Sequence, residues 1–465
     1  MSYRFMARDM QRRFAESARA LAVSVGEGEA RLVTQTDLSG LFFARACELY
    51  LRVGGRIAMV MPLAAMTRGQ FRAFRTGAFH GAPVAFAEAW VLDNQDISPV
   101  FRVPTCVLFA RRTQALATAL PDRATWFYGR LPHKDAPEEV ARDRVEMREG
   151  PAPARAVYDA RSPYRDRFRQ GATLVPRALL LVRRVDGGRL GYDAAAPLVR
   201  SRRSAQEKAP WKDLPDFEGA IEAAFLRPVF LGESIAPFRV LGASEAIVPV
   251  LPEGDMLDAR QAEARGLPAL AAWLAHCDAL WTRHGNGRTC FTRNLDHFGK
   301  LAGQFPLRPL RVVFAGSGSR PAAALVEDAE AVVEHALYWA AVASREEGLY
   351  LLAILNSETA RARVAHLQAR GEQGARHFDK LMFTLPIPAF DPRDPLHAHL
   401  VALATRARTV ADAVELAPAT PFVRARGQIR EALAADGIAA AIDRSVAQLL
   451  DGAEAEAAAM VAEEV

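Results

Sequence analysis

Cysteine is scarce in this 465-residue sequence: Cys47, Cys106, Cys277 and Cys290 are scattered, and no two of them form a CxxC pair. This spacing excludes a disulfide framework and a zinc site, so we expect no metal. Long apolar runs are missing too, and none approaches the roughly eighteen residues of a membrane span. The basic residues 1–13 are not followed by an apolar segment, unlike a secretion signal. We therefore expect a protein of the reducing cytoplasm with no membrane partner.

The composition is that of an ordinary folded protein. Hydrophobic residues make up 50% of the sequence and charged residues 24%, a balance that excludes general disorder. A chain of this length holds two or three domains with an ample core. We find no internal repeat, and no low-complexity segment apart from an alanine-rich tail at residues 451–465.

Positive charge is concentrated in one part of the sequence. The whole chain carries a net charge of +5, whereas residues 151–210 hold 13 Lys and Arg against 5 Asp and Glu. The tail at residues 451–465 is acidic instead. A local basic excess suits a polyanionic partner such as nucleic acid. A solvated, arginine-rich surface explains the composition at least as well.

Residues 36–62, TDLSGLFFARACELYLRVGGRIAMVMP, predict a helix followed by a strand. Thr36 or Asp37 can cap the helix, Gly54-Gly55 ends it, and the apolar residues 56–62 predict a fully buried strand. This order is typical of a doubly wound α/β sheet, which needs several strand–helix units. The roughly thirty-five residues upstream contain no buried strand. We therefore expect the sequence to open in the middle of a domain.

The following residues continue this first domain. We expect helices at residues 5–21 and 67–78, and strands at residues 84–92 and 105–111. The two strands are joined by a loop, which predicts an antiparallel pair at one edge of the sheet.

Beyond about residue 120 the pattern changes to short strands, Gly/Pro turns and single helices. The expected strands are residues 178–184, 238–241, 247–251 and 310–315, and the expected helices are residues 267–281 and 347–355. From residue 396 the sequence is mostly alanine-rich helix. These patterns predict an α/β domain at residues 1–118, an α+β domain at residues 119–395 and a helical segment at residues 396–465.

Several motifs, in their order and spacing, resemble adenine-specific DNA methyltransferases. The similarity is to large enzymes in which methylase and target-recognition domain share one chain, as in fused restriction–modification enzymes. The motifs are residues 37–43, 54–62, 168–172 with 176–177, 226–229 with 232–234, and 337–339. The most specific are YLLAILNS at residues 350–357 and RHFDK at 376–380, followed by LPIP at 385–388.

The resemblance implies methyl transfer from S-adenosylmethionine to the exocyclic amino group of adenine. The base is flipped out of the duplex, because its target atom is unreachable while stacked. In the family an Asn/Asp-Pro-Pro-aromatic tetrapeptide binds that amino group, and a Gly-rich turn holds the cofactor. The tetrapeptide does not occur in this sequence. In the family it stands just before a segment similar to residues 2–6, which implies that the catalytic loop and the cofactor half lie upstream of Met1.

We therefore expect a truncated, Rossmann-like S-adenosylmethionine-dependent methyltransferase sheet, followed by an α+β target-recognition domain and a helical C-terminus. Without the missing strands this sheet would expose a strand edge and an apolar face. The leading interpretation is a DNA adenine-N6 methyltransferase fragment that binds double-stranded DNA. It would bind no S-adenosylmethionine alone and would need the missing N-terminal half. That half would be encoded in frame directly upstream, if the start is misassigned, or supplied by a separate N-terminal methyltransferase chain, if the enzyme is split. The alternatives are a stand-alone DNA-binding or specificity subunit, and a decayed remnant without function.

The resemblance places Asp37, Ser39, Pro62 and Phe101 near the active site. A helix N-cap explains Asp37 equally well. Pro62 ends a strand at the sheet edge where ligands of open α/β folds bind, although a role as strand terminator is favoured. Core packing is the favoured explanation for Phe101.

Residues 314–318, FAGSG, match an FxGxG cofactor turn after an apolar strand, which makes Gly316 and Gly318 candidate cofactor residues. Cofactor binding needs a helix N-terminus directly after the glycines, and Pro321 can begin such a helix. The family order instead places this stretch inside the recognition region, where a structural turn is favoured.

The candidates for DNA contact are basic residues of the charge-rich stretch. As a group they can neutralise phosphates and give salt-sensitive binding. For any single one, a plain surface charge is the favoured explanation. They are Arg165, Arg167, Arg169, Arg177, Arg183, Arg184, Arg202, Arg203 and Lys208.

Overall fold

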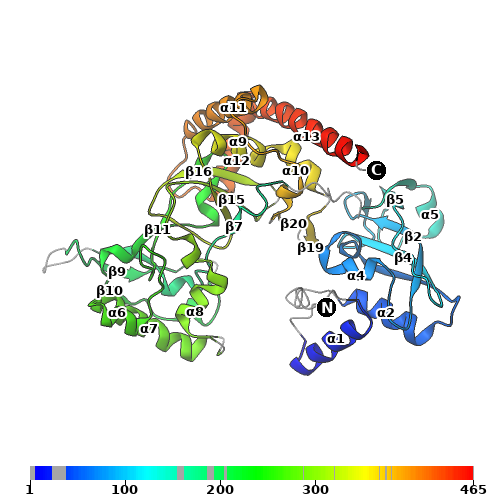
Figure 1. Cartoon of the computed structure of the whole chain (residues 1–465), viewed down its shortest axis with the longest axis horizontal. Helices are drawn as coiled ribbons and strands as arrows, with labels where there is room; N and C mark the ends of the chain where they lie inside the picture. Colours follow the sequence, from blue (N-terminus) through cyan, green and yellow to red (C-terminus); the bar gives the residue numbers. More distant parts are fainter. Residues whose placement is uncertain are drawn as a thin grey trace. The chain divides into compact units, whose positions relative to one another are not determined.

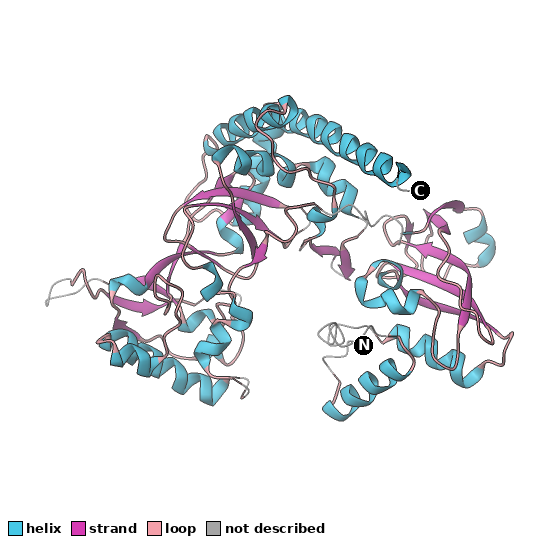
Figure 2. Ribbon diagram, viewed as in Figure 1, coloured by secondary structure: helices cyan, strands magenta, loops and turns pink. Residues whose placement is uncertain are grey.

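The chain is a mixed α/β protein with several separate sheets (Figure 2). The computed structural model describes residues 6–23, 38–153, 162–185, 193–203, 207–285, 287, 289–318, 320–365, 367–371, 374–378 and 380–463. Two compact units make up the chain: unit 1 (Met1–Asp159 with Ala365–Arg376) and unit 2 (Ala160–Val364 with His377–Val465). Among the described residues, no helix has the length and hydropathy that crossing a membrane requires.

Unit 1 combines one six-stranded sheet with short helices (Figure 1). Its elements are α1 (Arg8–Ala20), α2 (Ser39–Tyr50), β1 (Arg56–Pro62), α3 (Ala64–Thr67), α4 (Arg72–Arg75), β2 (Val84–Leu92), β3 (Ile97–Ser98), β4 (Thr105–Arg112), β5 (Arg123–Arg130), α5 (Glu138–Arg142) and β6 (Val145–Pro151). The strand pair β19 (Ala369–Gly371) and β20 (Gly374–His377) comes much later in the chain. The helix expected at residues 67–78 is broken, because Arg68 has an extended conformation.

The strand order in unit 1 is β1-β4-β2-β5-β3, and β6 pairs with β5. β4 is antiparallel to both β1 and β2, which confirms the expected antiparallel pair. It follows that β1 and β2 run in the same direction with β4 between them. β5 is parallel to β2 and β3. The domain boundary expected after residue 118 thus falls inside this sheet, because β5 and β6 extend it and the compact unit ends at Asp159.

Helices α2, α3 and α4 pack on one face of this sheet. Phe43 of α2 lies 5.4 Å from Phe74 of α4 and 5.6 Å from Phe86 of β2, measured between ring centroids. Arg112 of β4 donates hydrogen bonds from Nη1 to the carbonyls of Cys47 and Glu48, each at 3.1 Å. These bonds tie the end of α2 to the sheet, because the last carbonyls of a helix have no partner within it.

β1 has the expected bounds, but the expectation of a fully buried strand is wrong. Met61 is 1% exposed, whereas Val60 is 55% exposed, and the residues between Arg56 and Met61 alternate between exposed and half-buried. Because β1 lies at the sheet edge and only one of its faces packs against the helical core, the side chains on its other face stay accessible to solvent. An alternating pattern is what a strand with one solvated face shows.

Unit 2 contains two larger sheets and most of the helices. Its strands are β7 (Arg169–Gln170), β8 (Leu181–Arg184), β9 (Leu198–Ser201), β10 (Glu218–Ala220), β11 (Leu226–Phe230), β12 (Ile235–Ala236), β13 (Arg239–Val240), β14 (Ser244–Ile247), β15 (Leu310–Ala315), β16 (Ala322–Glu327), β17 (Val332–Val333) and β18 (Leu337–Ala341). Its helices are α6 (Ala259–Ala264), α7 (Pro268–His284), α8 (Phe291–Leu295), α9 (Arg345–Asn356), α10 (Glu358–Ala365), α11 (Pro395–Asp412), α12 (Phe422–Ala435) and α13 (Ile438–Glu463).

The six-stranded sheet of unit 2 has the order β10-β9-β8-β14-β11-β17, and the four-stranded sheet has the order β16-β15-β18-β7. Trp273 and Leu274 of α7 are buried in the core that covers the first sheet. The expected helices at residues 267–281 and 347–355 and the strand at 310–315 are confirmed. The strands expected at residues 238–241 and 247–251 form only in part, as β13 and the last residue of β14.

The motif at residues 350–357 holds the four-stranded sheet together. It forms the buried second half of α9, which packs on β15 and β16. Asn356 accepts a hydrogen bond from the Ala323 amide at 2.9 Å and donates one to its carbonyl at 3.0 Å. The C-terminal segment is helical as expected, and α11 packs against α9, α12 and α13. This segment therefore belongs to unit 2.

Candidate nucleic-acid interface and open sheet face

Four of the nine basic residues proposed for DNA contact are held by carboxylates of their own chain. The ion pairs are Arg167–Glu347 at 2.6 Å, Arg177–Glu334 at 3.1 Å, Arg184–Glu245 at 2.8 Å and Arg203–Asp216 at 3.2 Å. A guanidinium that already binds a carboxylate has less positive charge to offer to a phosphate. These four are thus weaker candidates than the sequence indicated.

Arg177 departs furthest from the expectation of a surface charge. Its side chain is buried, and its partner Glu334 is fully buried. Glu334 also accepts a hydrogen bond from the Ala336 amide at 3.0 Å and follows β17 directly, just before β18. Because β17 and β18 belong to different sheets, this ion pair lies where the two sheets of unit 2 connect. Its position indicates a structural role.

The other five basic residues have no ion pair with a carboxylate within the part of the chain that the structure describes. They are Arg165, Arg169, Arg183, Arg202 and Lys208, of which Arg165 is half-buried and the rest are exposed. Arg202 donates a hydrogen bond to the Ser244 hydroxyl at 3.4 Å. These five keep their charge available to a polyanion.

Two of these five lie beside a lysine that the sequence did not single out. Lys380 donates from Nζ to the Arg165 carbonyl at 2.9 Å. Burial lowers the pKa of Lys380, and the charges of Arg165 and Arg169 act in the same direction, whereas Asp166 opposes them. We call Arg165, Arg169 and Lys380 the β7 cluster. Lys380 belongs to the RHFDK motif, to which the sequence assigned no chemistry, so its place beside these arginines was missed.

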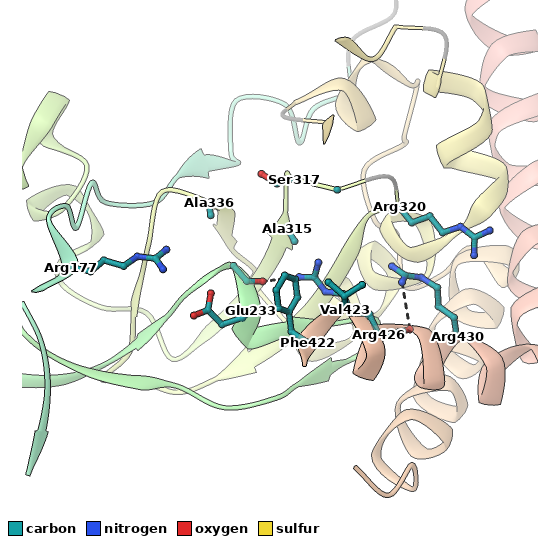
Figure 3. A pocket seen from close by; sticks show the side chains of 12 residues that line it. Arg177, Glu233, Ala315, Ser317, Arg320, Ala336, Phe422, Val423, Arg426 and Arg430 are labelled. Carbon is teal, nitrogen blue, oxygen red and sulfur yellow. Dashed lines mark hydrogen bonds between the residues drawn. The ribbon is translucent and has the colours of Figure 1, made fainter. Parts of the chain in front are cut away.

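A second basic group borders a cavity of about 420 Å³ in unit 2 (Figure 3). Arg320 reaches it from the turn between β15 and β16, while Arg426 and Arg430 reach it from α12. Sequence reasoning missed these three arginines, because they come from segments 100 residues apart. The spacing of four residues between Arg426 and Arg430 was the available signal, since it places both on one helix face.

The geometric condition for a cofactor turn at Gly316 and Gly318 is not met. Pro321 does not begin a helix: the chain turns directly into β16, which is antiparallel to β15 from Ala315 onward. The carbonyl of Gly316 accepts a hydrogen bond from the Phe378 amide at 2.8 Å. The glycines therefore form the turn of a β-hairpin, and the helix that a cofactor phosphate or carboxylate would meet is replaced by a strand.

The end of β1 at Pro62 and the end of the loop that carries Phe101 are adjacent in unit 1. Pro62 is the last residue of β1, and the next amide, of Leu63, donates to the Pro104 carbonyl at 3.0 Å. This bond places the loop that carries Phe101 beside Pro62. Phe101 is 37% exposed, so the core role favoured from the sequence is wrong.

Ser39 is the first residue of α2, which packs against β1 and leads into it through a short turn. The helix and the strand therefore run in opposite directions, and Ser39 lies toward the same end of the sheet as Pro62. Asp37 lies outside the described residues. The catalytic neighbourhood of these residues remains a prediction.

The face of the unit 1 sheet opposite the helical core carries apolar side chains that stay accessible. Trp90 of β2 lies 4.8 Å from Phe109 of β4 and 5.3 Å from Phe127 of β5, between ring centroids. All three are half-buried, and Val60 and Met147 at the margins are exposed. We call these five residues the open face. Within the described residues, β1 also has an unpaired edge, since β4 is its only partner.

Metal and thiol chemistry find little support in the described residues. No group of three or more His, Cys, Asp or Glu side chains is placed to hold a metal ion there. Burial raises the pKa of the Cys47 thiol to about 11, although Arg112 opposes the shift, and raises that of Cys106 to about 12. Thiols of this kind stay protonated and unreactive at neutral pH.

No known family model matches the chain, and no curated protein matches it. Similar solved structures include the Type IIL restriction-modification enzyme MmeI in complex with DNA, at 11% identity and a TM-score of 0.46, covering 95% of this chain and 55% of that one. The Type IIG restriction endonuclease BpuSI is similar at 13% identity and a TM-score of 0.26, covering 96% of this chain and 53% of that one. The chain thus spans about half the length of each. Both are restriction enzymes, the broad class that the sequence motifs resemble, and neither similarity assigns a role to a residue of this chain.

Proposed function

We propose that this chain is the DNA-recognition part of a site-specific adenine-N6 methyltransferase of the restriction–modification type. Unit 2 binds double-stranded DNA. Unit 1 is the end of a Rossmann-like sheet on which a separate methyltransferase chain docks, and that chain brings S-adenosylmethionine and the Asn/Asp-Pro-Pro-aromatic motif. The observation that carries the proposal is the open face of unit 1 together with the unpaired edge of β1.

The open face supports docking because soluble proteins rarely leave aromatic residues of a sheet in water without a use for them. An unpaired strand edge adds a row of free backbone donors and acceptors, which a further strand can pair with. Both features were expected from the sequence if the upstream strands of the sheet belong to another chain. The same strand end carries Pro62, next to the loop of Phe101, where the family has its active site.

The basic residues of unit 2 support DNA binding. The β7 cluster brings charge from two segments more than 200 residues apart to one place, and Arg183, Arg202 and Lys208 are exposed without a carboxylate partner among the described residues. Positive groups of this kind bind phosphates without reading the base sequence. We therefore expect binding that is strong at low salt and falls steeply as salt increases.

Fluorescence anisotropy with a labelled DNA duplex over a salt series tests the DNA-binding part. Each phosphate contact adds about 0.9 to the slope of log affinity against log salt concentration. The double variant Arg165→Ala/Arg169→Ala should lower that slope by roughly 2. The matched control is Arg142→Ala/Arg148→Ala, which removes the same charge from exposed positions of unit 1. Equal slopes for both double variants would contradict a role for the β7 cluster.

Calorimetry and complementation test the methyltransferase part. S-adenosylmethionine titrated into the isolated chain should give no saturable heat, and saturable binding would contradict a cofactor half on another chain. Co-expression with the polypeptide encoded directly upstream should give methyl transfer to DNA. Val60→Asp on the open face should abolish that transfer but leave DNA binding intact. Leu116→Asp is the control, since Leu116 is an exposed apolar residue of unit 1 outside the open face.

The alternative of a stand-alone specificity subunit gives a different pattern. DNA binding would persist, no combination of chains would transfer a methyl group, and Val60→Asp would change nothing.

A further inference from the structure

The cavity beside α12 in unit 2 is a half-open pocket in which several arginine side chains come together (Figure 3). Its walls come from the β15–β16 turn with Ser317 and Gly318, from the 3-10 turn at Gly232–Ser234, and from the first turns of α12. A volume of about 420 Å³ lies within the range of small-ligand sites. The space is therefore large enough for a group the size of phosphate and part of what carries it.

Within the part of the chain that the structure describes, three arginines of this cavity form no ion pair with a carboxylate: Arg320, Arg426 and Arg430. Glu233 is the one acidic residue among the described residues of the lining. The fourth arginine of the lining, Arg177, is balanced by Glu334. The cavity lining thus carries an excess of positive charge, which Glu233 in the lining and Glu358 near Arg430 offset only in part.

The guanidinium groups are close enough to repel one another. Burial lowers the pKa of Arg426 to about 10, and the charge of Arg430 acts in the same direction, while Glu233 opposes it. Burial likewise lowers the pKa of Arg430 to about 10; the charge of Arg320 acts in the same direction, and Glu358 opposes it. Holding like charges together in a partly buried space costs free energy, which a bound anion would recover.

Two of the three arginines are fixed in place by backbone carbonyls. Arg426 donates from Nε to Ile235 at 2.8 Å and from Nη2 to Gly232 at 2.7 Å, and it lies 5.0 Å over the ring of Phe422. Arg430 donates from Nη2 to Pro321 at 2.9 Å. Because these bonds hold the charges in position without an anion, little ordering would be needed when one binds.

We propose that this cavity binds a phosphate group. Arginine forks match the geometry of phosphate oxygens, and the first turn of α12 adds the partial positive charge of a helix N-terminus at the same wall. Arg320 is exposed and has no hydrogen bond or ion pair among the described residues, which leaves its guanidinium available to the entering anion. The proposal is independent of the methyltransferase assignment.

Calorimetric titration of the full chain with inorganic phosphate, against sodium chloride of equal ionic strength, tests the site. We expect saturable binding of phosphate and none of chloride. Arg320→Ala should weaken phosphate binding at least about tenfold, since it removes charge-assisted hydrogen bonds, and Arg320→Lys should weaken it less. Arg424→Ala, an exposed arginine of α12 outside the cavity lining, is the matched control and should bind like the unsubstituted chain. No saturable binding, or equal loss in Arg320→Ala and Arg424→Ala, would overturn the proposal.

Two further arms identify the source of the phosphate group. If the group belongs to a small ligand, deoxyadenosine monophosphate binds, deoxyadenosine does not, and Arg320→Ala leaves DNA affinity unchanged. If it belongs to the DNA backbone, Arg320→Ala lowers DNA affinity and inorganic phosphate competes with the duplex. Arg165→Ala/Arg169→Ala should leave the binding of inorganic phosphate unchanged in either case. A failure of DNA binding is thereby distinguished from a failure of this site.

Discussion

The two units depart from the usual distribution of residues in opposite directions. Unit 1 leaves apolar side chains in water: Val60 is 55% exposed and Met147 is 65% exposed, beside the half-buried aromatic rings of the open face. Unit 2 instead buries charge, with Arg311 and Glu334 fully buried and Arg426 nearly so. Among the described residues of unit 1, Asp93 is the one buried charged side chain.

The difference indicates different tasks. Exposed apolar surface lowers stability and solubility unless something covers it, so it points outward to a partner. Buried charge is costly unless it is paired or hydrogen-bonded, and a paired charge fixes the groups around it. In unit 2 buried charges bind carbonyls and carboxylates of neighbouring segments, for example Arg426 with the carbonyls of Ile235 at 2.8 Å and Gly232 at 2.7 Å. The buried charges of unit 2 therefore fix segments of that unit to one another, whereas the exposed apolar side chains of unit 1 form a surface that a partner can cover.

The largest loss of folding stability should come from breaking the Arg177–Glu334 ion pair, where the two sheets of unit 2 connect. Glu334→Ala leaves the buried Arg177 without its carboxylate and the Ala336 amide without its acceptor. Loss of one partner of a buried pair costs about 3–5 kcal/mol. Chemical denaturation followed by circular dichroism should show a free energy of unfolding that is lower by about this amount.

Glu218→Ala is the matched control for this loss. Glu218 also forms an ion pair in unit 2, with Arg200, but both side chains are more than a third exposed, at 37% and 38%. Exposed pairs contribute about 0–1 kcal/mol. Similar losses in the two variants would show that burial does not distinguish the charges of unit 2.

The next largest loss of folding stability should come from shortening a valine in a buried strand of unit 2, compared with the same change in an edge strand of unit 1. Val313 lies in the middle of β15, is fully buried and pairs on both sides, with Ala324 and Trp339. Val313→Ala should cost roughly 2–3 kcal/mol, because it leaves a cavity in a packed core. Val60→Ala, at the open face on the edge strand β1, should cost less than about 1 kcal/mol.

Hydrogen exchange resolved by peptide separates the two units, because local opening of each can be followed independently. Val313→Ala should accelerate exchange in β15 and β18 and leave β1 and β4 unchanged. Val60→Ala should leave both regions nearly unchanged. Equal acceleration of β1 and β4 by Val60→Ala would mean that the open face is covered.

The same two strands show what the sequence can and cannot predict about the fold. Apolar runs predicted β1 and β15 with the correct bounds, since the conformation of a short segment follows from its own residues. Only β1 was expected to be fully buried, yet β15 is the buried strand of the two. Burial depends on which strands and helices lie beside a segment, and for β1 these neighbours come from β4 and α2, not from its own residues.

The candidate site was predictable to a smaller degree. The density of arginine in residues 151–210 identified the basic region, but Arg167 is paired with Glu347, which lies 180 residues away in the sequence. The phosphate cavity combines Arg320 with Arg426 and Arg430, whose segments are joined only by the packing of α12 against the sheets. Charge pairing over such distances is set by tertiary structure, so local sequence reveals the number of charges but not their partners.

The smallest expected effect is on the pH dependence of the free energy of unfolding, and it compares a buried carboxylate of unit 2 with an exposed one of unit 1. Burial raises the pKa of Glu347, but hydrogen bonds from Arg167 and the Ala343 amide outweigh it, so the pKa lies below its ordinary value of 4.5. In unit 1, the Arg148 guanidinium likewise lowers the pKa of Glu146. Glu347 is buried, whereas Glu146 is exposed and stands two residues from its partner.

A carboxyl with a lowered pKa in the folded state stabilises the fold above its unfolded pKa, and that stability is lost as the pH falls through the folded pKa. The unsubstituted chain should therefore be more stable than Glu347→Gln at pH 6 to 7, and the difference should shrink as the pH drops below about 4.5. For Glu146→Gln the difference should be near zero at every pH, because the pair with Arg148 is local, solvent-screened and hardly depends on folding. Urea denaturation at several pH values measures both differences. A pH-dependent difference of the same size for Glu146→Gln would mean that the Glu146–Arg148 pair of unit 1 is coupled to folding as strongly as the Glu347–Arg167 pair of unit 2. The contrast between the two units would then not extend to their ion pairs.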